Sequence, residues 1–195
     1  MTLTAGVIAV QGDVSEHATA IETAAARHDT AVEVVTIRDA GLVLDCDLLL
    51  IPGGESTTIS TLLASEGIDD EIRTHVERDK PVLATCAGLI VLARDAQDGR
   101  VDTLGLLDVT VDRNAFGRQA DSFQTPLDVA GLDTPFPAVF IRAPAIETVG
   151  ERATVLAEWN DRIVAARDGP IVATAFHPEL TEDARIHELT FFHEG

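Results

Sequence analysis

The sequence contains very little lysine. Lys80 is its only one, and the other thirteen basic residues are arginines. Against 14 Lys+Arg stand 33 Asp+Glu, which gives a net charge of −19 at pH 7. Such a field repels phosphate backbones and anionic lipids, so nucleic acids and membrane surfaces are excluded as partners. An acidic, lysine-poor surface is typical of halophilic proteins, because concentrated counterions in salt-accumulating cells screen the self-repulsion.

Cysteine is also scarce. Cys46 and Cys86 are too few for a disulfide framework, and the sequence has no Cys-x-x-Cys pattern. The first residues, MTLTAGVIAVQGD, lack the basic segment of a signal peptide. No apolar run approaches the roughly 18 residues that a membrane span needs. We therefore expect a soluble, cytoplasmic protein.

The first hundred residues alternate strand-like and helix-like segments. With 195 residues, of which 46% are hydrophobic, we expect one α/β domain over residues 1–195 without internal repeats. Uninterrupted apolar runs occupy 5–10, 32–37, 47–51 and 81–86, and helical segments occupy 14–28, 56–79 with a break near Gly67, and 87–96. Uninterrupted apolar strands separated by helices predict a parallel sheet covered on both faces.

The pattern changes after about residue 100. Strand-like runs follow closely at 104–111, 138–143, 154–159, 162–167 and 171–176, and a final helix is predicted to begin near Thr181. The close spacing indicates antiparallel additions to the sheet. The predicted fold is a three-layer α/β sandwich with a mostly parallel central sheet plus antiparallel additions.

Cys86 follows a predicted buried strand and opens a predicted helix, with small residues around it. A nucleophile on such a tight strand-to-helix turn projects above the carboxyl edge of the sheet. The amino terminus of the helix favours the thiolate, because its partial charge is positive. The same segment also fits a buried structural cysteine.

His177 and Glu179 lie at the end of another predicted strand. In an extended segment two residues that are two positions apart project to the same side. The carboxylate can then accept a hydrogen bond from one imidazole nitrogen and leave the other facing a thiol. This arrangement activates a sulfur nucleophile, although a His-Pro-Glu triplet alone is also typical of a surface turn.

Pro52-Gly53-Gly54-Glu55-Ser56 follows a third strand. Two glycines let the backbone approach a ligand, and their amides could stabilise a developing oxyanion. A plain turn before a Ser or Thr helix cap fits the same residues. A phosphate-binding loop is excluded, because the Gly-x-x-x-x-Gly-Lys-Ser/Thr pattern is missing.

These three strand ends resemble those of the class I, triad-type glutamine amidotransferases. More narrowly, the chain is similar to the family of glutaminase subunits of pyridoxal 5′-phosphate synthases. The blocks that carry this similarity run in the family's order from residue 7 to about 190. They are Val10-Gln11-Gly12 with Glu16-His17, PGGESTT at 52–58, TCAGLIVLA at 85–93, RNAFGRQ at 113–119 with Asp121-Ser122-Phe123, FIRAP at 140–144 and FHPELTED at 176–183.

The resemblance implies roles for individual residues. Cys86 would be the nucleophile, His177 the general acid and base, and Glu179 its orienting carboxylate. The backbone amides of Gly53, Gly54 and Ala87 would hold the oxyanion. The positions that match the family's glutamine-binding residues are Gly54, Glu55, Ser56, Arg113, Ile141 and Arg142. From the residues alone, the two arginines could equally form surface salt bridges.

The resemblance also implies a partner. Ammonia would pass through a tunnel to a (β/α)₈-barrel synthase subunit in a large hetero-oligomer, which combines it with a pentose phosphate and a triose phosphate. Gln11 and Gly12 are candidates for coupling the glutaminase to that partner, although they also fit a polar strand-to-helix turn. We expect neither a cofactor nor a metal site, because the remaining histidines lack ligand spacing.

One position departs from the family pattern, since Ala84 occupies the place where the elbow usually has glycine. We expect the added methyl group to be tolerated. Three alternatives stay open: a glutaminase subunit of another amidotransferase, a catalytically silent interaction subunit of the same fold, and a stress or redox protein with a cysteine elbow. The 113–119 block argues against the first, and intact Cys86, His177 and Glu179 argue against the others.

Overall fold

The computed structural model describes residues 2–12, 14–116 and 122–192. Residues 117–121, which include the end of the 113–119 block and Asp121, lie outside the described part. The first half contains β1 (Thr2–Ile8), α1 (Ser15–Arg27), β2 (Ala31–Ile37), η1 (Val43–Asp45), β3 (Leu48–Ile51), α2 (Ser56–Glu66), α3 (Ile68–Glu77), β4 (Val82–Thr85), α4 (Ala87–Leu92) and β5 (Ala93–Asp95).

The second half consists mainly of strands. Its elements are β6 (Leu107–Asp112), β7 (Phe123–Leu127), β8 (Phe136–Phe140), β9 (Ala145–Val149), β10 (Ala153–Trp159), β11 (Arg162–Asp168), β12 (Ile171–Thr174), η2 (Pro178–Leu180) and α5 (Arg185–Phe191). The change from alternating elements to consecutive strands confirms the organisation predicted from the sequence.

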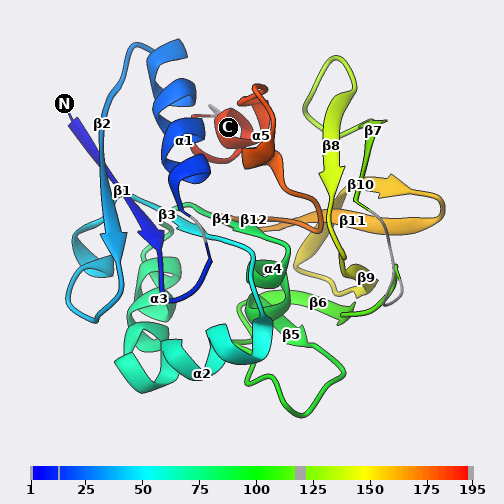
Figure 1. Cartoon of the computed structure of the whole chain (residues 1–195), viewed down its shortest axis with the longest axis horizontal. Helices are drawn as coiled ribbons and strands as arrows, with labels where there is room; N and C mark the ends of the chain where they lie inside the picture. The colour runs from blue at the N-terminus through cyan, green and yellow to red at the C-terminus, as the bar shows by residue number, and fades with distance from the viewer. Residues whose placement is uncertain (1, 13, 117–121, 193–195) are drawn as a thin grey trace.

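One large sheet runs through the molecule in the order β2-β1-β3-β4-β12-β11-β9-β6-β5, with β10 paired to β11. Its first five strands are parallel. Helices α1 and α5 cover one face of this parallel part, and α2, α3 and α4 lie on the other (Figure 1). Strands β3 and β4 are buried along their whole length, as continuous apolar runs between two helical layers require.

The other part of the large sheet is antiparallel from β12 through β11 and β9 to β6. Strands β7 and β8 pair only with each other and form a second, two-stranded antiparallel sheet. This small sheet lies on the same side as α1 and α5, next to β10 and β11 (Figure 1). The predicted three-layer α/β sandwich with antiparallel additions is therefore confirmed.

Several predicted element boundaries were wrong. The run at 138–143 does not join the large sheet, because β8 pairs with β7. The helix predicted over 87–96 ends at Leu92, and Ala93–Asp95 continue as a short strand beside β6. The final helix begins at Arg185 rather than near Thr181, since the Thr181 hydroxyl and the Asp183 carboxylate form local turns with the amides of Asp183 and Arg185.

The interior of the parallel part contains two residues whose surroundings could not be predicted from the sequence, Ala84 and Cys46. Ala84 is fully buried in β4, paired with Ile51 on one side and Ala173 on the other. Cys46 is 1% exposed, and its thiol contacts the carbonyl oxygen of Leu42 at 3.3 Å. Burial raises the pKa of the Cys46 thiol to about 11, despite the opposing Lys80 charge. No helix within the described residues is long and apolar enough to cross a membrane.

Candidate active site

Cys86 stands on a strained turn between β4 and α4. Its backbone has φ 50° and ψ −105°, a left-handed conformation that is unusual for a residue with a side chain. Its amide donates to the carbonyl oxygen of Thr174 at 2.8 Å, which ties the turn to β12. A Cβ on Gly88 would overlap the carbonyl oxygen of Ile51, so α4 can pack this closely only with glycine there. The predicted elbow is therefore present.

His177 leaves the neighbouring strand at the same edge of the sheet. Strands β4 and β12 are parallel and aligned so that Thr85 pairs with Thr174, which brings their carboxyl ends together. The amide of His177 donates to the carbonyl oxygen of Val139 at 2.8 Å and fixes the segment against β8. A Cβ built on Gly53 would lie 2.8 Å from His177 Cε1 and 3.4 Å from Cys86 Cβ, so all three residues meet.

The carboxylate of Glu179 orients the His177 ring. His177 Nδ1 lies 2.6 Å from Glu179 Oε1, the contact that was predicted from their spacing. The extended conformation assumed for that prediction was wrong, because Pro178–Leu180 form the single turn η2. Proline at the start of this turn reverses the chain, and the turn brings Glu179 back toward the ring.

Electrostatics at this pair favour a charged state. Burial by itself would lower the pKa of His177, but hydrogen bonds with Cys86 and Glu179 outweigh it and raise the pKa to about 10. Burial likewise works against ionisation of Glu179, yet hydrogen bonds from His17 and His177 hold its pKa below the ordinary value. At neutral pH the ring is therefore an imidazolium held against the Glu179 carboxylate, and a histidine so placed beside a cysteine can activate a sulfur nucleophile.

The glycine loop before α2 lies directly against the thiol and the imidazole. Glu55, rather than a Ser or Thr, is the helix N-cap, because its carboxylate accepts from the amides of Thr57 and Thr58 at 3.1 and 2.8 Å. The amide of Glu55 donates to Gln11 Oε1 at 2.7 Å, which links the loop to the end of β1. A Cβ on Gly12 would lie 2.9 Å from the Gly53 oxygen, so both predicted coupling residues pack against this loop.

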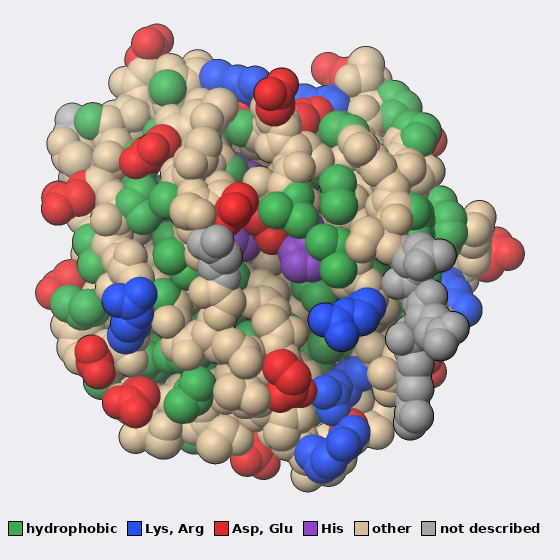
Figure 2. Space-filling view, in the orientation of Figure 1, with side chains coloured by type: hydrophobic (Ala, Val, Ile, Leu, Met, Phe, Trp, Pro, Cys, Tyr) green, Lys and Arg blue, Asp and Glu red, His purple; other side chains and the backbone are tan. Residues whose placement is uncertain are grey.

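A cavity of about 490 Å³ collects these groups and the predicted glutamine-binding positions. It is lined by Gly54, Glu55, Ser56, Cys86, Ala87, Ile90, Arg113, Asn114, Ile141, Arg142 and His177. Figure 2 shows a hollow near the middle of one face, with histidine side chains in its wall and Lys and Arg side chains gathered on one side. Of these lining residues, Ile90 and Asn114 were not predicted. A single residue on a helix and a single amide in a loop belong to no sequence pattern that indicates a binding site.

The two arginines of the cavity differ in their pairing. Arg113 is held between two carboxylates: its Nη2 lies 3.2 Å from Glu55 Oε1, and its Nη1 donates to Asp98. Arg142 is exposed, has a φ of 42°, and makes no hydrogen bond or ion pair within the described residues. Among the described residues, the salt-bridge alternative left open for both therefore holds for Arg113 only, and Arg142 is a cation of the cavity without an ion-pair partner there.

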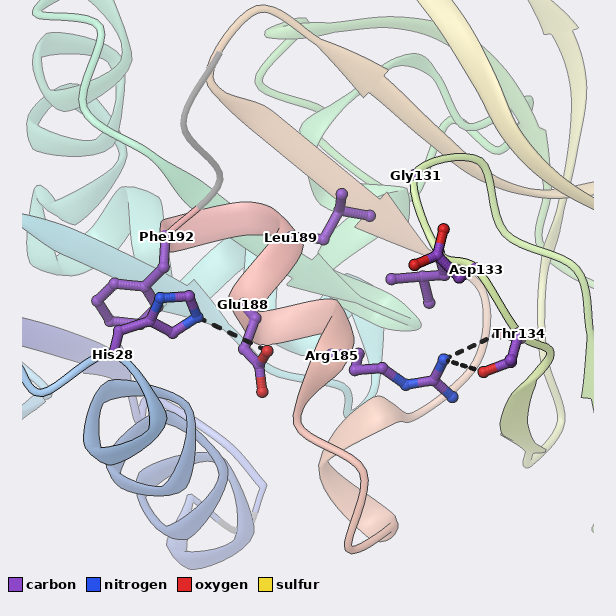
Figure 3. Close-up of a pocket in the computed structure, with 9 residues that line it drawn as sticks. His28, Gly131, Asp133, Thr134, Arg185, Glu188, Leu189 and Phe192 are labelled. Atoms are coloured by element: carbon purple, nitrogen blue, oxygen red, sulfur yellow. Dashed lines mark hydrogen bonds and ion pairs between the residues drawn. The ribbon is translucent and has the colours of Figure 1, made fainter.

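Another cavity, of about 480 Å³, lies between α5 and the loop before β8. In Figure 3 the Arg185 side chain reaches across to Thr134, while His28 stacks on Phe192 and approaches Glu188. Arg185 also forms an ion pair with Asp183 outside the cavity, and no cysteine is among the lining residues. Among the residues that the structure describes, no three His, Cys, Asp or Glu side chains are placed to hold a metal ion.

Known proteins agree with this architecture. The model of the SNO glutamine amidotransferase family matches residues 7–194. A Haloarcula marismortui protein named pyridoxal 5′-phosphate synthase subunit PdxT is 71% identical over 192 residues, which cover 98% of this chain and 98% of that protein. The Methanosarcina acetivorans protein of the same name is 53% identical and covers 94% of each chain.

A solved structure described as a glutamine amidotransferase superposes with a TM-score of 0.83 at 42% sequence identity, covering 95% of this chain and 96% of that one. The fold of this chain is thus that of a glutamine amidotransferase. Within that class, the chain belongs to the SNO glutamine amidotransferase family. The resemblance inferred from the sequence is confirmed.

Proposed function

We propose that this protein is the glutaminase subunit of a pyridoxal 5′-phosphate synthase. It hydrolyses L-glutamine to L-glutamate and ammonia and delivers the ammonia to a synthase subunit. The observation that carries the proposal is the cavity that joins the Cys86 elbow to His177 and its Glu179 partner. The shared name of the relatives from Haloarcula and Methanosarcina supports the biosynthetic assignment.

The first half of the reaction forms a thioester. The Cys86 thiolate attacks the carboxamide carbon of glutamine and a tetrahedral intermediate forms. The amides of Gly53, Gly54 and Ala87 stabilise its oxyanion, and Ala87 is suited to this role because the first-turn amides of a helix have no acceptor within it. The carbon–nitrogen bond then breaks while protonated His177 gives its proton to the leaving nitrogen, so ammonia departs and a γ-glutamyl thioester remains.

The second half consumes water. Neutral His177 removes a proton from a water molecule, which attacks the thioester carbon. The carbon–sulfur bond breaks, glutamate leaves, and the thiolate and the imidazolium are restored. Glu179 keeps the ring in the tautomer and orientation that both halves need, and it stays ionised throughout.

Glutamine's other end is held by charge. Despite some desolvation, hydrogen bonds from Thr58 and Thr57 lower the pKa of Glu55 to about 2, so this carboxylate is anionic and attracts the α-ammonium group. Arg142, without an ion-pair partner in the described chain, supplies a planar donor for the α-carboxylate. Ser56 and Ile141 complete the wall, and Arg113 holds Glu55 in place.

The ammonia acceptor would be a (β/α)₈-barrel synthase subunit in a large hetero-oligomer. We assign Gln11 and Gly12 to the coupling, because Gln11 accepts from the Glu55 amide and Gly12 packs on Gly53. A partner that moves the end of β1 would therefore move the oxyanion loop. The cytoplasmic location stays a prediction.

The test is glutamate release from glutamine in multimolar potassium chloride, with and without the cognate synthase subunit. We expect turnover that depends on the partner and falls at least about 10⁴-fold in Cys86→Ala. Cys46→Ala is the matched control, since Cys46 is a buried cysteine away from the cavity, and it should keep turnover.

No turnover in the wild type while the two subunits bind would favour the silent interaction subunit. Ala84→Gly would then show whether the elbow methyl group is responsible. Turnover that only the synthase of another pathway activates would favour a different amidotransferase.

A further inference from the structure

His17 is a buried polar side chain to which the mechanism above gives no role. It lies in the first turn of α1 and is only 1% exposed, although it belongs to a polar segment at the start of a helix. Its Nε2 is 3.4 Å from Glu179 Oε1, the same oxygen that His177 Nδ1 contacts at 2.6 Å. One carboxylate oxygen is thus shared by two imidazole rings from opposite ends of the chain.

The hydrogen-bonding surroundings of His17 fix which nitrogen carries the proton. Nε2 faces two oxygens, Glu179 Oε1 and Thr85 Oγ1, each at 3.4 Å. Nδ1 is buried and has no hydrogen-bond partner within the described residues. A buried N–H without a hydrogen-bond acceptor costs more free energy than one that has an acceptor. The proton of the neutral ring therefore belongs on Nε2, which faces Glu179.

Within the described residues, Glu179 is the carboxylate that forms an ion pair with His17. A second titratable neighbour is His187 on α5, with ring centroids 6.1 Å apart. Burial first, and the nearby His17 second, lower the pKa of His187 to about 3, so that ring is neutral. The electrostatic interaction of His17 is therefore directed at Glu179.

Glu179 depends on this contact because its other oxygen is unsupported. Oε2 is buried and has no partner within the described residues, and the whole side chain is only 7% exposed. Without His17, a buried carboxylate would be held through one contact to His177 alone. It would then be free to rotate about its last bond, and each rotation would withdraw Oε1 from the His177 ring.

We propose that His17 is a positioning residue that donates its Nε2 proton to Glu179 and so holds this carboxylate against His177. The proposal rests on the proposed function. Through Thr85, which immediately precedes Cys86, the same ring also touches the strand end that carries the nucleophile. His17 would thereby link α1 to both members of the catalytic pair without contacting the substrate.

Three variants test this role in the complex with the cognate synthase subunit. His17→Leu removes the donor at similar volume. His17→Gln restores an N–H donor near the position of Nε2. His187→Leu is the matched control, since it removes an equally buried imidazole that makes no hydrogen bond or ion pair with Glu179 among the described residues. We expect kcat to fall about 10–100-fold in His17→Leu with KM unchanged, to recover in His17→Gln, and to stay near wild type in His187→Leu.

A readout that needs no turnover separates this proposal from the proposed function. The proton on His177 Nδ1 should give a downfield proton magnetic resonance signal, because its bond to Glu179 is short. In the isolated chain we expect this signal to broaden or vanish in His17→Leu and to persist in His17→Gln and His187→Leu. Thermal unfolding of all three shows whether they are folded.

Several results would overturn the positioning role. An unchanged signal and kcat in folded His17→Leu would do so, and so would equal losses in His17→Leu and His187→Leu. If His17→Leu does not fold, His17→Gln decides: loss of the signal there also overturns it. A wild-type protein without turnover would contradict the proposed function, while the downfield proton signal would still report on the role of His17.

Discussion

The first 115 residues and the remainder of the chain build their cores from different side chains. All seven phenylalanines and the single tryptophan lie at or beyond residue 116, and the chain has no tyrosine. The parallel part of the sheet, enclosed by helices, is filled with Ile, Leu, Val and Ala. Short branched side chains suit strands that are covered on both faces, because neighbouring layers interlock closely.

The later part of the chain relies on ring packing where backbone pairing is missing. The small sheet β7–β8 shares no ladder with the large one. An aromatic cluster of Phe116, Phe123, Phe140 and Trp159 joins them, with Phe123 centroids 4.9 Å from Phe140 and 4.8 Å from Trp159. Phe140 also packs on Phe176, 5.7 Å away, which directly precedes His177. Rings thus anchor the β8 region and the segment that carries His177 together.

The candidate site lies where these two parts of the chain meet, at the carboxyl ends of β4 and β12. The first part supplies Cys86, on the turn after β4, and Arg113, and the later part supplies His177 and Arg142. The comparison teaches that the strained turn at Cys86 is held by close backbone packing, whereas Arg142 lies on an exposed bend. The following changes act on one side at a time.

The largest loss of stability is expected where the aliphatic part is packed so closely that an added methyl group has no space. Gly88→Ala would push a methyl group into the Ile51 carbonyl, which is backbone and cannot rotate away. We expect a loss of about 3 kcal/mol or more of unfolding free energy, together with glutaminase activity. Gly99→Ala is the matched control, since nothing lies within 4 Å of its added carbon. Guanidinium unfolding that is equal for both variants would contradict the close packing.

A smaller effect should separate the two arginines of the cavity. Arg142→Gln removes a cation that has no ion-pair partner in the described part of the chain, so KM for glutamine should rise about 10–100-fold with kcat nearly unchanged. Arg113→Gln breaks its links to Glu55 and Asp98 and should lower kcat as well, because the oxyanion loop loosens. Steady-state kinetics in the complex measure both. Identical changes in the two variants would show that their different pairing does not matter.

The pH dependence of stability should report on the protonated His177 ring, which lies where the two parts meet. The pKa of His177 rises from its ordinary 6.5 to about 10 on folding. The stability that this proton provides is fully present below 6.5 and is lost as the pH rises through about 10. His177→Asn should remove this alkaline loss in unfolding curves, while His187→Leu should retain it. An alkaline loss of the same size in His177→Asn would contradict the charged pair.

The smallest difference between the two parts should be their response to salt, because acidic residues are spread along the whole chain. With a net charge of −19, screening by potassium chloride should raise Tm as one cooperative transition. Each kcal/mol gained corresponds to about 2–4 °C. Differential scanning calorimetry across salt concentrations measures this, and a Tm independent of salt would remove the halophilic interpretation.

The same division explains what could be predicted from the sequence. Continuous apolar runs were sufficient to predict β3, β4 and the elbow, since a strand that is buried on both faces is apolar at every position. β7 and β9 were missed because both are short and partly exposed, and Pro126 interrupts the first. His17 carried no signal, since its partner Glu179 lies far along the chain.

The position of β12 has a consequence for synthesis. This strand is made after both β4 and β11, yet it lies between them in the middle of the sheet. Until it emerges from the ribosome, β4 and β11 each have an open edge where β12 will pair, and His177 is not yet beside Cys86. Cys86 and His177 therefore come together only after β12 has been made, so a product that stops before β12 carries the thiol without its imidazole.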